Sequence, residues 1–393
     1  MTETGKVPHI MLVAGEPSGD ALGGELMEAL KELTHGAVRI TGAGGPKMIA
    51  QGLTPIFPMS DTSVMGPREV IPRLPLILRR MRETADLAVR VRPDVLVIID
   101  SPDFTHMVAK RVAKRAPDIP IANYVSPSVW AWRRGRARAM ARYITRVLAL
   151  LPFEPDFFRA EAGLDCVYVG HPAIERLPKQ GSGASFRSVR GMKADQPLVL
   201  LLPGSRTNEV KRLMEDFRKT AEILAHDVPG IKFVLPTVPH VRHLVEAAIE
   251  RWTVPVELID SEDEKRAAFD AATAALAASG TVSLELGLAR VPMVIAYKID
   301  PIAAWVVSGL LMVPSVVVVN LILDRPSVRE FLQFAAKPAA LAEALKPLLA
   351  DTPERRRALR DLDELREIMG VGGERPSLRA ARAVLDMLPA RFK

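Results

Sequence analysis

Short apolar segments rich in β-forming residues alternate with segments of helical periodicity along most of this chain of 393 residues. In the first half, these apolar segments are His9–Ala14, Val95–Asp100 and Ile121–Val125. The alternation restarts later, at Leu198–Leu202, Ile231–Leu235, Ala274–Ala278 and Met293–Tyr297. Strands that alternate with helices are typical of βαβ units, which build parallel sheets. We therefore expect an α/β protein with two domains of this kind.

A segment rich in Gly and Ser, residues 179–184, separates the two series of strands. This composition favours a loop, so we place the domain linker between Gly170 and Asp195.

The stretch from Pro301 to Leu323 contains no charged side chain and is long enough to cross a bilayer. However, Pro314 lies in its middle, and the Val-rich half that follows has the composition of a strand. Three interpretations remain open: a buried helix followed by a strand, a transmembrane helix, or a partly exposed helix that docks on a membrane.

Charge and cysteine content exclude several classes of protein. Lys and Arg number 53 against 46 Asp and Glu, and the net charge of +7 favours anionic partners. Aromatic residues make up only 5% of the chain, and no zinc-finger or RNA-binding signature is present, so we expect no nucleic-acid partner. The single cysteine, Cys166, forms no internal disulfide. We expect no signal peptide, because Met1–Lys6 lacks a basic segment and the apolar run His9–Ala14 is too short for one. We expect a cytoplasmic protein without a structural metal.

Two polar turns follow expected strands of the first domain. The first strand runs into Gly15–Asp20, which contains Glu16, and Asp100 directly follows another buried strand. Ligands of open parallel sheets bind at the carboxyl ends of the strands, so Asp100 is the first candidate for a general base. Alternatively, Asp100 or Asp103 only caps the next helix, and Asp20 is only an acid at the start of its own helix.

The third expected strand leads into Tyr124–Trp132, and a run of arginines follows from Arg133 to Arg146. Two tryptophans beside arginines suit a phosphate or an anionic lipid headgroup. A core tryptophan beside a solvated basic helix is the alternative.

In the second domain, a strand ends at Ser279-Gly280-Thr281, where the next helix begins. The free N–H groups at a helix start attract phosphate, and Glu285 lies one turn further on the same face, where it can reach a ribose. Arg206 follows another strand and could pair with a diphosphate. The sequence therefore predicts a nucleotide site, although these side chains would also serve as ordinary helix caps.

Together these motifs resemble the lipid-A-disaccharide synthase family over nearly the whole chain. The motifs that carry the resemblance are Gly15–Asp20, Val64–Gly66, Asp100–Phe104, Tyr124–Arg133, Leu151–Glu154, Gly170–Pro172, Leu202–Arg206 with Glu209, Ala278–Glu285, and Asn320 to Gln333. The chain departs from the family before Asn320, where Val318-Val319 replaces the usual Leu-Pro.

The resemblance implies a GT-B fold, in which two Rossmann-like domains face each other across a cleft and the last helix crosses back to the first domain. The expected domains are an acceptor and membrane-side domain at 1–175, a UDP-sugar domain at 176–365, and a C-terminal helical segment at 366–393. The implied reaction transfers a sugar, with inversion, from UDP-2,3-diacylglucosamine to 2,3-diacylglucosamine 1-phosphate, which yields the lipid A disaccharide 1-phosphate and UDP. No metal or cofactor is implied, and the single D-x-D motif, Asp361–Asp363, falls in a charged helix that we interpret as solvated surface.

The resemblance also assigns residues to roles. Asp100 and Glu16 are the expected catalytic residues. The expected UDP-binding residues are Arg206, Ser279, Gly280, Thr281, Glu285 and Asn320. The expected substrate-binding residues are Ser18, Gly19, Asp20, Met65, Ser126, Trp130 and Arg133.

Acylated substrates require an apolar docking surface at the inner face of the inner membrane. The candidates are residues 64–82, with Ile71, Leu74, Leu76, Ile77 and Leu78 among arginines, and the segment Ile302–Met312. A homodimer also remains open. The rival functions are a UDP-sugar 2-epimerase of the same architecture and a nucleotide-binding or membrane-adaptor protein without catalysis.

Overall fold

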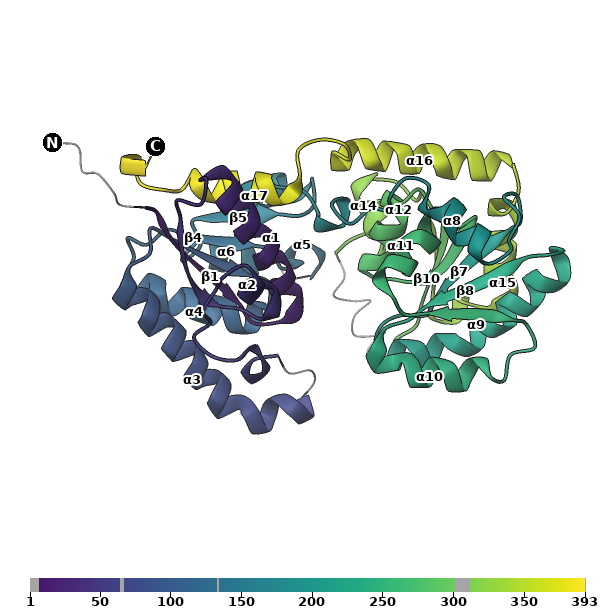
Figure 1. Ribbon diagram of the computed structural model, residues 1–393, viewed down its shortest axis with the longest axis horizontal. Helices are drawn as coiled ribbons and strands as arrows, with labels where there is room; N and C mark the ends of the chain where they lie inside the picture. Colours follow the sequence, from purple (N-terminus) through teal and green to yellow (C-terminus); the bar gives the residue numbers. More distant parts are fainter. Residues whose placement is uncertain (1–6, 64–66, 133, 301–311, 393) are drawn as a thin grey trace. The chain divides into compact units, whose positions relative to one another are not determined.

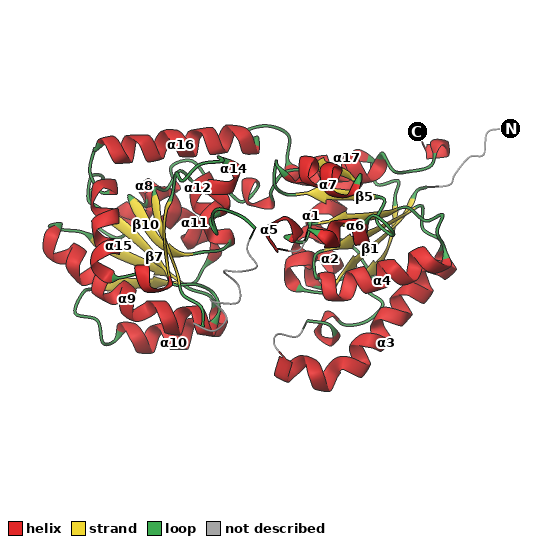
Figure 2. Ribbon diagram, turned by 180° about the vertical axis from the view of Figure 1, so that it is seen from behind, coloured by secondary structure: helices red, strands yellow, loops and turns green. Residues whose placement is uncertain are grey.

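The structure, a computed structural model, describes residues 7–63, 67–132, 134–300 and 312–392. The chain divides into two compact units. Unit 1 comprises residues 1–172 together with 372–393, and unit 2 comprises residues 173–371. Each unit contains a six-stranded parallel sheet with helices on both faces (Figures 1 and 2), which confirms the expected α/β fold.

The sheet of unit 1 has the strand order β2-β1-β3-β4-β5-β6. Its strands are β1 His9–Ala14, β2 Arg39–Ala43, β3 Val95–Ile99, β4 Ile121–Tyr124, β5 Arg146–Ala149 and β6 Asp165–Tyr168. The central strands β1 and β3 are buried along their whole length. Because helices cover both faces of a parallel sheet, such strands are continuously apolar, and this made them recognisable in the sequence.

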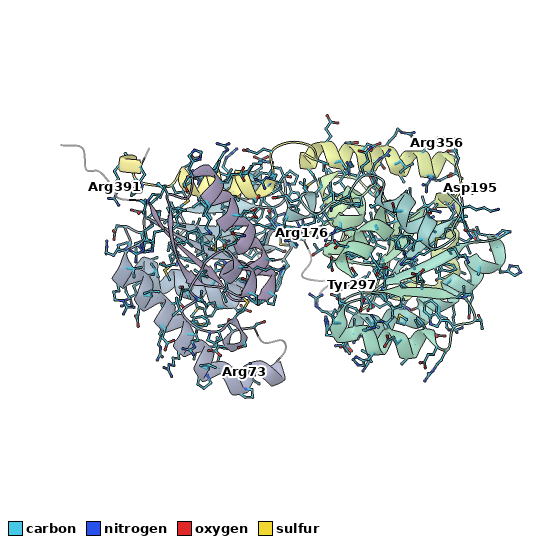
Figure 3. All side chains as sticks on the ribbon, viewed as in Figure 1. Arg73, Arg176, Asp195, Tyr297, Arg356 and Arg391 are labelled. Carbon is cyan, nitrogen blue, oxygen red and sulfur yellow. The ribbon has the colours of Figure 1, made fainter. Side chains whose placement is uncertain are left out.

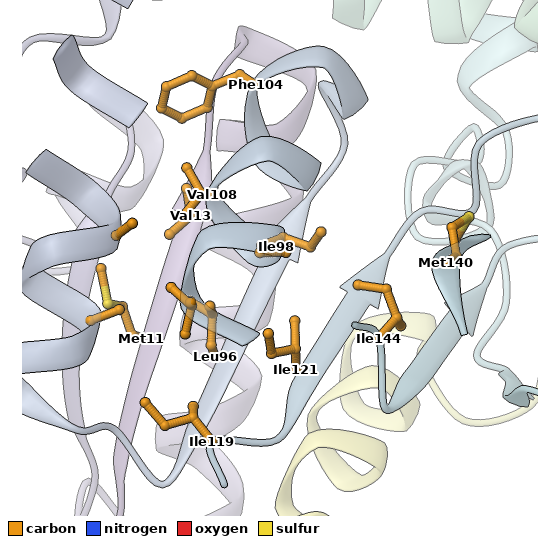
Figure 4. Packing of buried hydrophobic residues seen from close by; sticks show 14 of the residues in the cluster. Met11, Val13, Leu96, Ile98, Phe104, Val108, Ile119, Ile121, Met140 and Ile144 are labelled. Carbon is orange, nitrogen blue, oxygen red and sulfur yellow. The ribbon is translucent and has the colours of Figure 1, made fainter. Parts of the chain in front are cut away.

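Two hydrophobic cores lie on opposite faces of this sheet. Successive side chains of a strand point to opposite faces, so Met11 and Val13 enter one core while Ile10 and Leu12 enter the other. Figure 4 shows the first of these cores, which includes Phe104 and Val108. The helices of unit 1 are α1 Pro17–Leu33, α2 Pro46–Ala50, α3 Pro67–Val91, α4 Pro102–Arg115, α5 Val129–Trp132, α6 Gly135–Met140, α7 Glu154–Ala162 and α17 Pro376–Leu385.

The sheet of unit 2 has the strand order β12-β11-β10-β7-β8-β9. Its strands are β7 Leu198–Leu202, β8 Lys232–Pro236, β9 Val256–Ile259, β10 Ala274–Ala278, β11 Met293–Tyr297 and β12 Arg329–Leu332. The helices around it are α8 Ser182–Val189, α9 Thr207–Asp227, α10 Pro239–Ile249, α11 Glu262–Ala271, α12 Thr281–Leu288, α14 Val318–Ile322, α15 Pro338–Leu345 and α16 Pro353–Met369.

The last long helix returns to the first unit, as expected for a GT-B fold. Helix α16 belongs to unit 2, whereas α17 packs against α1 of unit 1. Ala380, Ala381 and Val384 of α17 are fully buried in the core beside β1. Arg146 of β5 donates to the carbonyl of Ala383 at 3.0 Å, which ties the helix to the sheet.

The Val-rich segment after Pro314 is not a strand, so that prediction was wrong. Residues Val318–Ile322 form the short helix α14. Val319 is fully buried, and a Cβ added to Gly287 of α12 would lie 3.2 Å from its side chain. Close packing on α12 therefore overrides the β-propensity of the local sequence. The preceding residues 301–311 lie outside the described residues, and within the described ones no helix is long and apolar enough to cross a membrane.

Two other expectations about surface segments also differ from the structure. The Gly- and Ser-rich segment 179–184 leads directly into α8, which packs on α11. A Cβ at Gly183 would lie 2.5 Å from the backbone of Asp270, so glycine here permits close helix packing.

The D-x-D motif, expected on solvated surface, contains a buried residue. Asp361 is buried and pairs with Arg325 at 2.9 Å.

Candidate functional site

The candidate residues of unit 1 gather at one edge of its sheet. Glu16, Asp100 and Ser126 follow the carboxyl ends of β1, β3 and β4, which are neighbours in the sheet. This is the edge at which open parallel sheets bind ligands.

Side-chain hydrogen bonds link the turns after β1 and β3. The hydroxyl of Ser18 donates to Oδ2 of Asp100 at 2.6 Å, and the hydroxyl of Ser101 donates to Oε1 of Glu16 at 2.9 Å. Ser101 is buried, whereas Asp100 and Glu16 are each partly exposed. The two carboxylates are therefore oriented by hydroxyl groups and remain accessible to a substrate. Sequence reasoning missed the contribution of Ser101.

The backbone at Asp100 is strained. Asp100 and Ser101 have φ angles of 52° and 47°, in the left-handed region that residues other than glycine rarely adopt. The amide of Asp100 donates to the carbonyl of Tyr124, and Thr105 donates to the carbonyl of Asp100. Surrounding bonds thus hold a conformation that is unfavourable by itself, as is common where side chains must be aimed at a ligand.

Gly19 and Asp20, which we expected to bind substrate, make contacts that stabilise the fold of unit 1. A Cβ at Gly19 would lie 2.9 Å from the carbonyl of Ile99, so glycine allows α1 to approach β3. The buried carboxylate of Asp20 accepts from the amides of Gly45, Lys47 and Met48 at 2.8 to 3.0 Å. Asp20 therefore caps the start of α2 instead of serving its own helix. These bonds argue against direct substrate contact by Asp20.

Ser126 and Trp130 both lie beside the carboxyl group of Glu154, a residue that is not among the expected site residues. The indole Nε1 of Trp130 donates to Glu154 Oε1 at 3.0 Å, and the ring of Trp130 meets Phe153 edge to face. Glu154 is 2% exposed, and burial raises its pKa to about 7, although hydrogen bonds from Leu151, Trp130, Ser126 and Leu150 favour the charged form. The sequence signal for this residue was its place in the motif Leu151–Glu154.

Unit 2 contains a pocket of about 320 Å³ at the carboxyl ends of β7, β8 and β10. Five of the six predicted UDP-binding residues line it: Arg206, Ser279, Gly280, Thr281 and Glu285. Helix α12 begins at Thr281, and its cap residue Gly280 has a φ of 152°, which suits glycine. The amides at the start of this helix thus form part of the pocket wall, as a phosphate site requires.

The turn before α9 is shaped by Glu209. Its carboxylate accepts from the amides of Ser205 and Arg206, and it pairs with the guanidinium of Arg206 at 2.7 Å, which raises the pKa of Arg206. The side chain of Arg206 is 78% exposed, so this ion pair is weak and Arg206 is free to turn toward a ligand. Gly204 has a φ of 112°, and a Cβ there would collide with Glu209.

Two further residues of the pocket were not predicted. Lys265 of α11 pairs with Glu285 at 2.9 Å and brings a cation to the pocket wall. Thr237 follows β8, and its buried hydroxyl has no hydrogen-bond partner among the described residues. A buried hydroxyl without a partner is rare, which makes Thr237 a candidate for a hydrogen bond to a ligand in this pocket.

Asn320 is not among the residues that line this pocket. Its buried amide donates to Ser315 Oγ and the carbonyl of Val328, and its oxygen accepts from the amide of Val328 at 2.7 Å. These bonds close the loop around α14 and argue against direct contact between Asn320 and UDP. Met65 and Arg133 lie outside the described residues.

Comparison with known proteins decides the family. The family model for lipid-A-disaccharide synthetase matches residues 10–381. The chain belongs to the lipid-A-disaccharide synthase family. The lipid-A-disaccharide synthase of Nitrobacter hamburgensis is 48% identical over 97% of this chain and 96% of that protein. The synthase of Rhodospirillum centenum is 46% identical over 97% of this chain and 95% of its own length.

Solved structures support the observed fold. The structure of MurG from Acinetobacter baumannii aligns with a TM-score of 0.57 over 96% of this chain and 99% of that chain, at 13% identity. UDP-GlcNAc 2-epimerase from Neisseria meningitidis bound to UDP-GlcNAc aligns with a TM-score of 0.61 over 96% and 98%, at 11% identity. At such identities the likeness concerns the fold alone, which is GT-B. The family assignment makes the protein a glycosyltransferase of lipid A biosynthesis and sets aside the epimerase and adaptor alternatives.

Proposed function

We propose that the protein transfers the sugar of UDP-2,3-diacylglucosamine to the 6-hydroxyl of 2,3-diacylglucosamine 1-phosphate by direct displacement. The new bond joins the acceptor oxygen to the anomeric carbon as the bond from that carbon to UDP breaks. The acceptor proton passes to a carboxylate, and UDP leaves with the bonding electrons. The observation that carries this proposal is the family match over residues 10–381, whose sequence folds into the two sites described above.

In unit 1, Asp100 is the proposed general base. Its carboxylate is accessible, its orientation is set by Ser18, and its backbone is held in an unusual conformation. Glu16, fixed by Ser101, supports the same step or the orientation of the acceptor. General-base catalysis of this kind contributes about 10²- to 10⁴-fold to a rate.

In unit 2, the pocket is the proposed site of UDP. The amides at the start of α12 and the guanidinium of Arg206 stabilise the diphosphate as its charge develops. Glu285 then receives the ribose hydroxyls. Lys265 faces Glu285 and holds its carboxylate in place, or moves toward the diphosphate when UDP binds.

The acylated substrates imply contact with a membrane, and helix α3 is the proposed docking element. Its first turns project from the body of unit 1 (Figures 1 and 2), and Ile71 and Leu74 are 70% and 46% exposed. Arg73 lies on the same turns of the helix (Figure 3). Apolar side chains beside arginines suit an anionic bilayer surface, at the inner face of the inner membrane. Ile77 is buried and Leu78 packs on the core, so these two residues are not part of the surface.

The function is tested by incubating the protein with both acylated substrates and measuring disaccharide and UDP together. The expected result is one disaccharide per UDP and no UDP when the acceptor is omitted. A changed UDP-sugar without acceptor would instead indicate epimerase chemistry, and absence of any product would contradict the proposal.

A further inference from the structure

Glu154 is a buried carboxyl group of unit 1 that takes no part in the chemistry proposed above. It is the first residue of α7, directly after the turn that follows β5. Its side chain is surrounded by hydrogen-bond donors: Oε1 accepts from the Trp130 indole, and Oε2 accepts from the amide of Leu151 at 3.0 Å. An ionised carboxylate is an acceptor only, so these donors favour its charged form, which burial restricts to pH values above about 7 by raising its pKa.

Trp130, the hydrogen-bond partner of Glu154, belongs to a short segment whose local structure is not stable by itself. Trp130 lies on α5, a helix of one turn, and the turn before it contains Val125 with a φ of 75°. A β-branched residue is a genuine outlier in that conformation. The segment keeps this geometry only if other contacts impose it, and a hydrogen bond to a buried charged group is among the strongest available.

The contact lies at the ligand-side edge of the sheet. The segment Ser126–Trp132 follows β4, the neighbour of β3, at whose end Asp100 lies. A shift of α5 would therefore alter the wall of the acceptor site without touching the catalytic carboxylate. Phe153 packs against the Trp130 ring with centroids 5.1 Å apart and leaves the indole N–H directed at Glu154.

We propose that Glu154 is a positioning residue: by accepting the indole N–H of Trp130, it fixes α5 and the preceding turn for binding of the acylated acceptor. This inference rests on the proposed function. Glu154 itself does not contact the substrate and acts through Trp130.

Steady-state kinetics of disaccharide formation test this role in Glu154→Gln, in Trp130→Phe and in the double variant. At pH 8, above the pKa of Glu154, the change to Gln replaces a charged acceptor by a neutral one, and Trp130→Phe removes the donor, so each change should raise KM for the acceptor about tenfold. The kcat should change by less than about twofold, because Asp100 is untouched. The double variant should be no worse than the more impaired single variant, since both changes act on the same contact. Asp156→Asn, an exposed change on the same helix, is the matched control and should behave as wild type.

A spectroscopic measurement separates positioning from general damage. The indole N–H resonance of Trp130, assigned through its loss in Trp130→Phe, should shift in Glu154→Gln and stay in place in Asp156→Asn. UDP affinity should be unchanged in all variants, because the UDP pocket belongs to unit 2.

Three outcomes would count against this role. An unchanged KM in both single variants, or effects that multiply in the double variant, would overturn it. An unchanged indole resonance in Glu154→Gln would overturn the contact itself. Absence of disaccharide from the wild type would instead overturn the proposed function.

Discussion

At the scale of single residues, two carboxylic acids of unit 1 are placed in opposite environments. Asp100 is partly exposed and accepts a hydrogen bond from one hydroxyl, whereas Glu154 is enclosed and has the raised pKa described above. The sequence predicted Asp100 because a strand end is visible in the hydrophobic pattern. Glu154 and Lys265 were not predicted, because their importance arises from Trp130 and Glu285, which are distant along the chain.

Replacing Asp100 by Asn should reduce turnover by about 10²- to 10⁴-fold, because an amide cannot accept the proton of the attacking hydroxyl. UDP affinity should stay near the wild-type value, since no pocket residue changes. Single-turnover product formation and UDP titration measure the two quantities. Asp103→Asn, at an exposed position in the first turn of α4, is the control. A rate above a tenth of wild type would remove Asp100 as the base.

The pH dependence of stability should reveal Glu154. Its pKa is raised to about 7 in the folded state, so between about pH 4.5 and 7 the folded chain holds a proton that the unfolded chain has lost. The wild type should therefore lose stability relative to Glu154→Gln as pH rises through this window, by on the order of 3 kcal/mol. Urea unfolding of both proteins from pH 5 to 8 measures the difference, and a flat difference would contradict the expected pKa.

At the scale of elements, the buried strands were predictable and the segment around α14 was not. Strands β1, β3, β7 and β10 are continuously apolar because both faces are covered, and this pattern is local. Residues 315–322 also have a strand composition, yet Asn320 bonds to Val328 and Val319 packs on α12. The contact with α12 joins residues that are distant in sequence, so no local pattern could reveal it.

Helix α3 should bind anionic membranes through its first exposed turns. Changing Ile71 and Leu74 to Asp together removes apolar area and adds negative charge, so both terms of interfacial binding become less favourable. Sedimentation with vesicles that contain an anionic phospholipid should fall at least about tenfold at low salt. Phe334→Asp in unit 2, where Phe334 is 84% exposed, is the matched control and should sediment as wild type. Equal sedimentation of both variants would contradict docking through α3.

At the scale of the whole molecule, the two-unit organisation followed from the restart of the strand pattern after residue 195. Only the family resemblance predicted that the last helix returns to unit 1. The sequence of α17 is amphipathic, and this pattern does not indicate which sheet the helix covers. Its place is set by α1 and by Arg146, hundreds of residues earlier.

Ending the chain after Val371 should unfold or destabilise unit 1 while sparing unit 2. The truncation uncovers the core beside β1, and it removes the bond from Arg379 to the carbonyl of Tyr168. UDP affinity should be retained, and disaccharide formation should be lost. Limited proteolysis should cut within residues 7–172 in the truncated protein alone. Full protection of that region would contradict a structural role for α17.

The return of α17 to unit 1 also sets the order in which the protein can be completed during synthesis. The ribosome makes the strands of unit 1 first, but residues 372–393 emerge only after the whole of unit 2. Until then, the face of the first sheet that α17 covers stays open to solvent. The N-terminal part of the nascent chain therefore keeps an exposed apolar face, and it is open to aggregation or to chaperone binding until α17 has been synthesised and packs on α1.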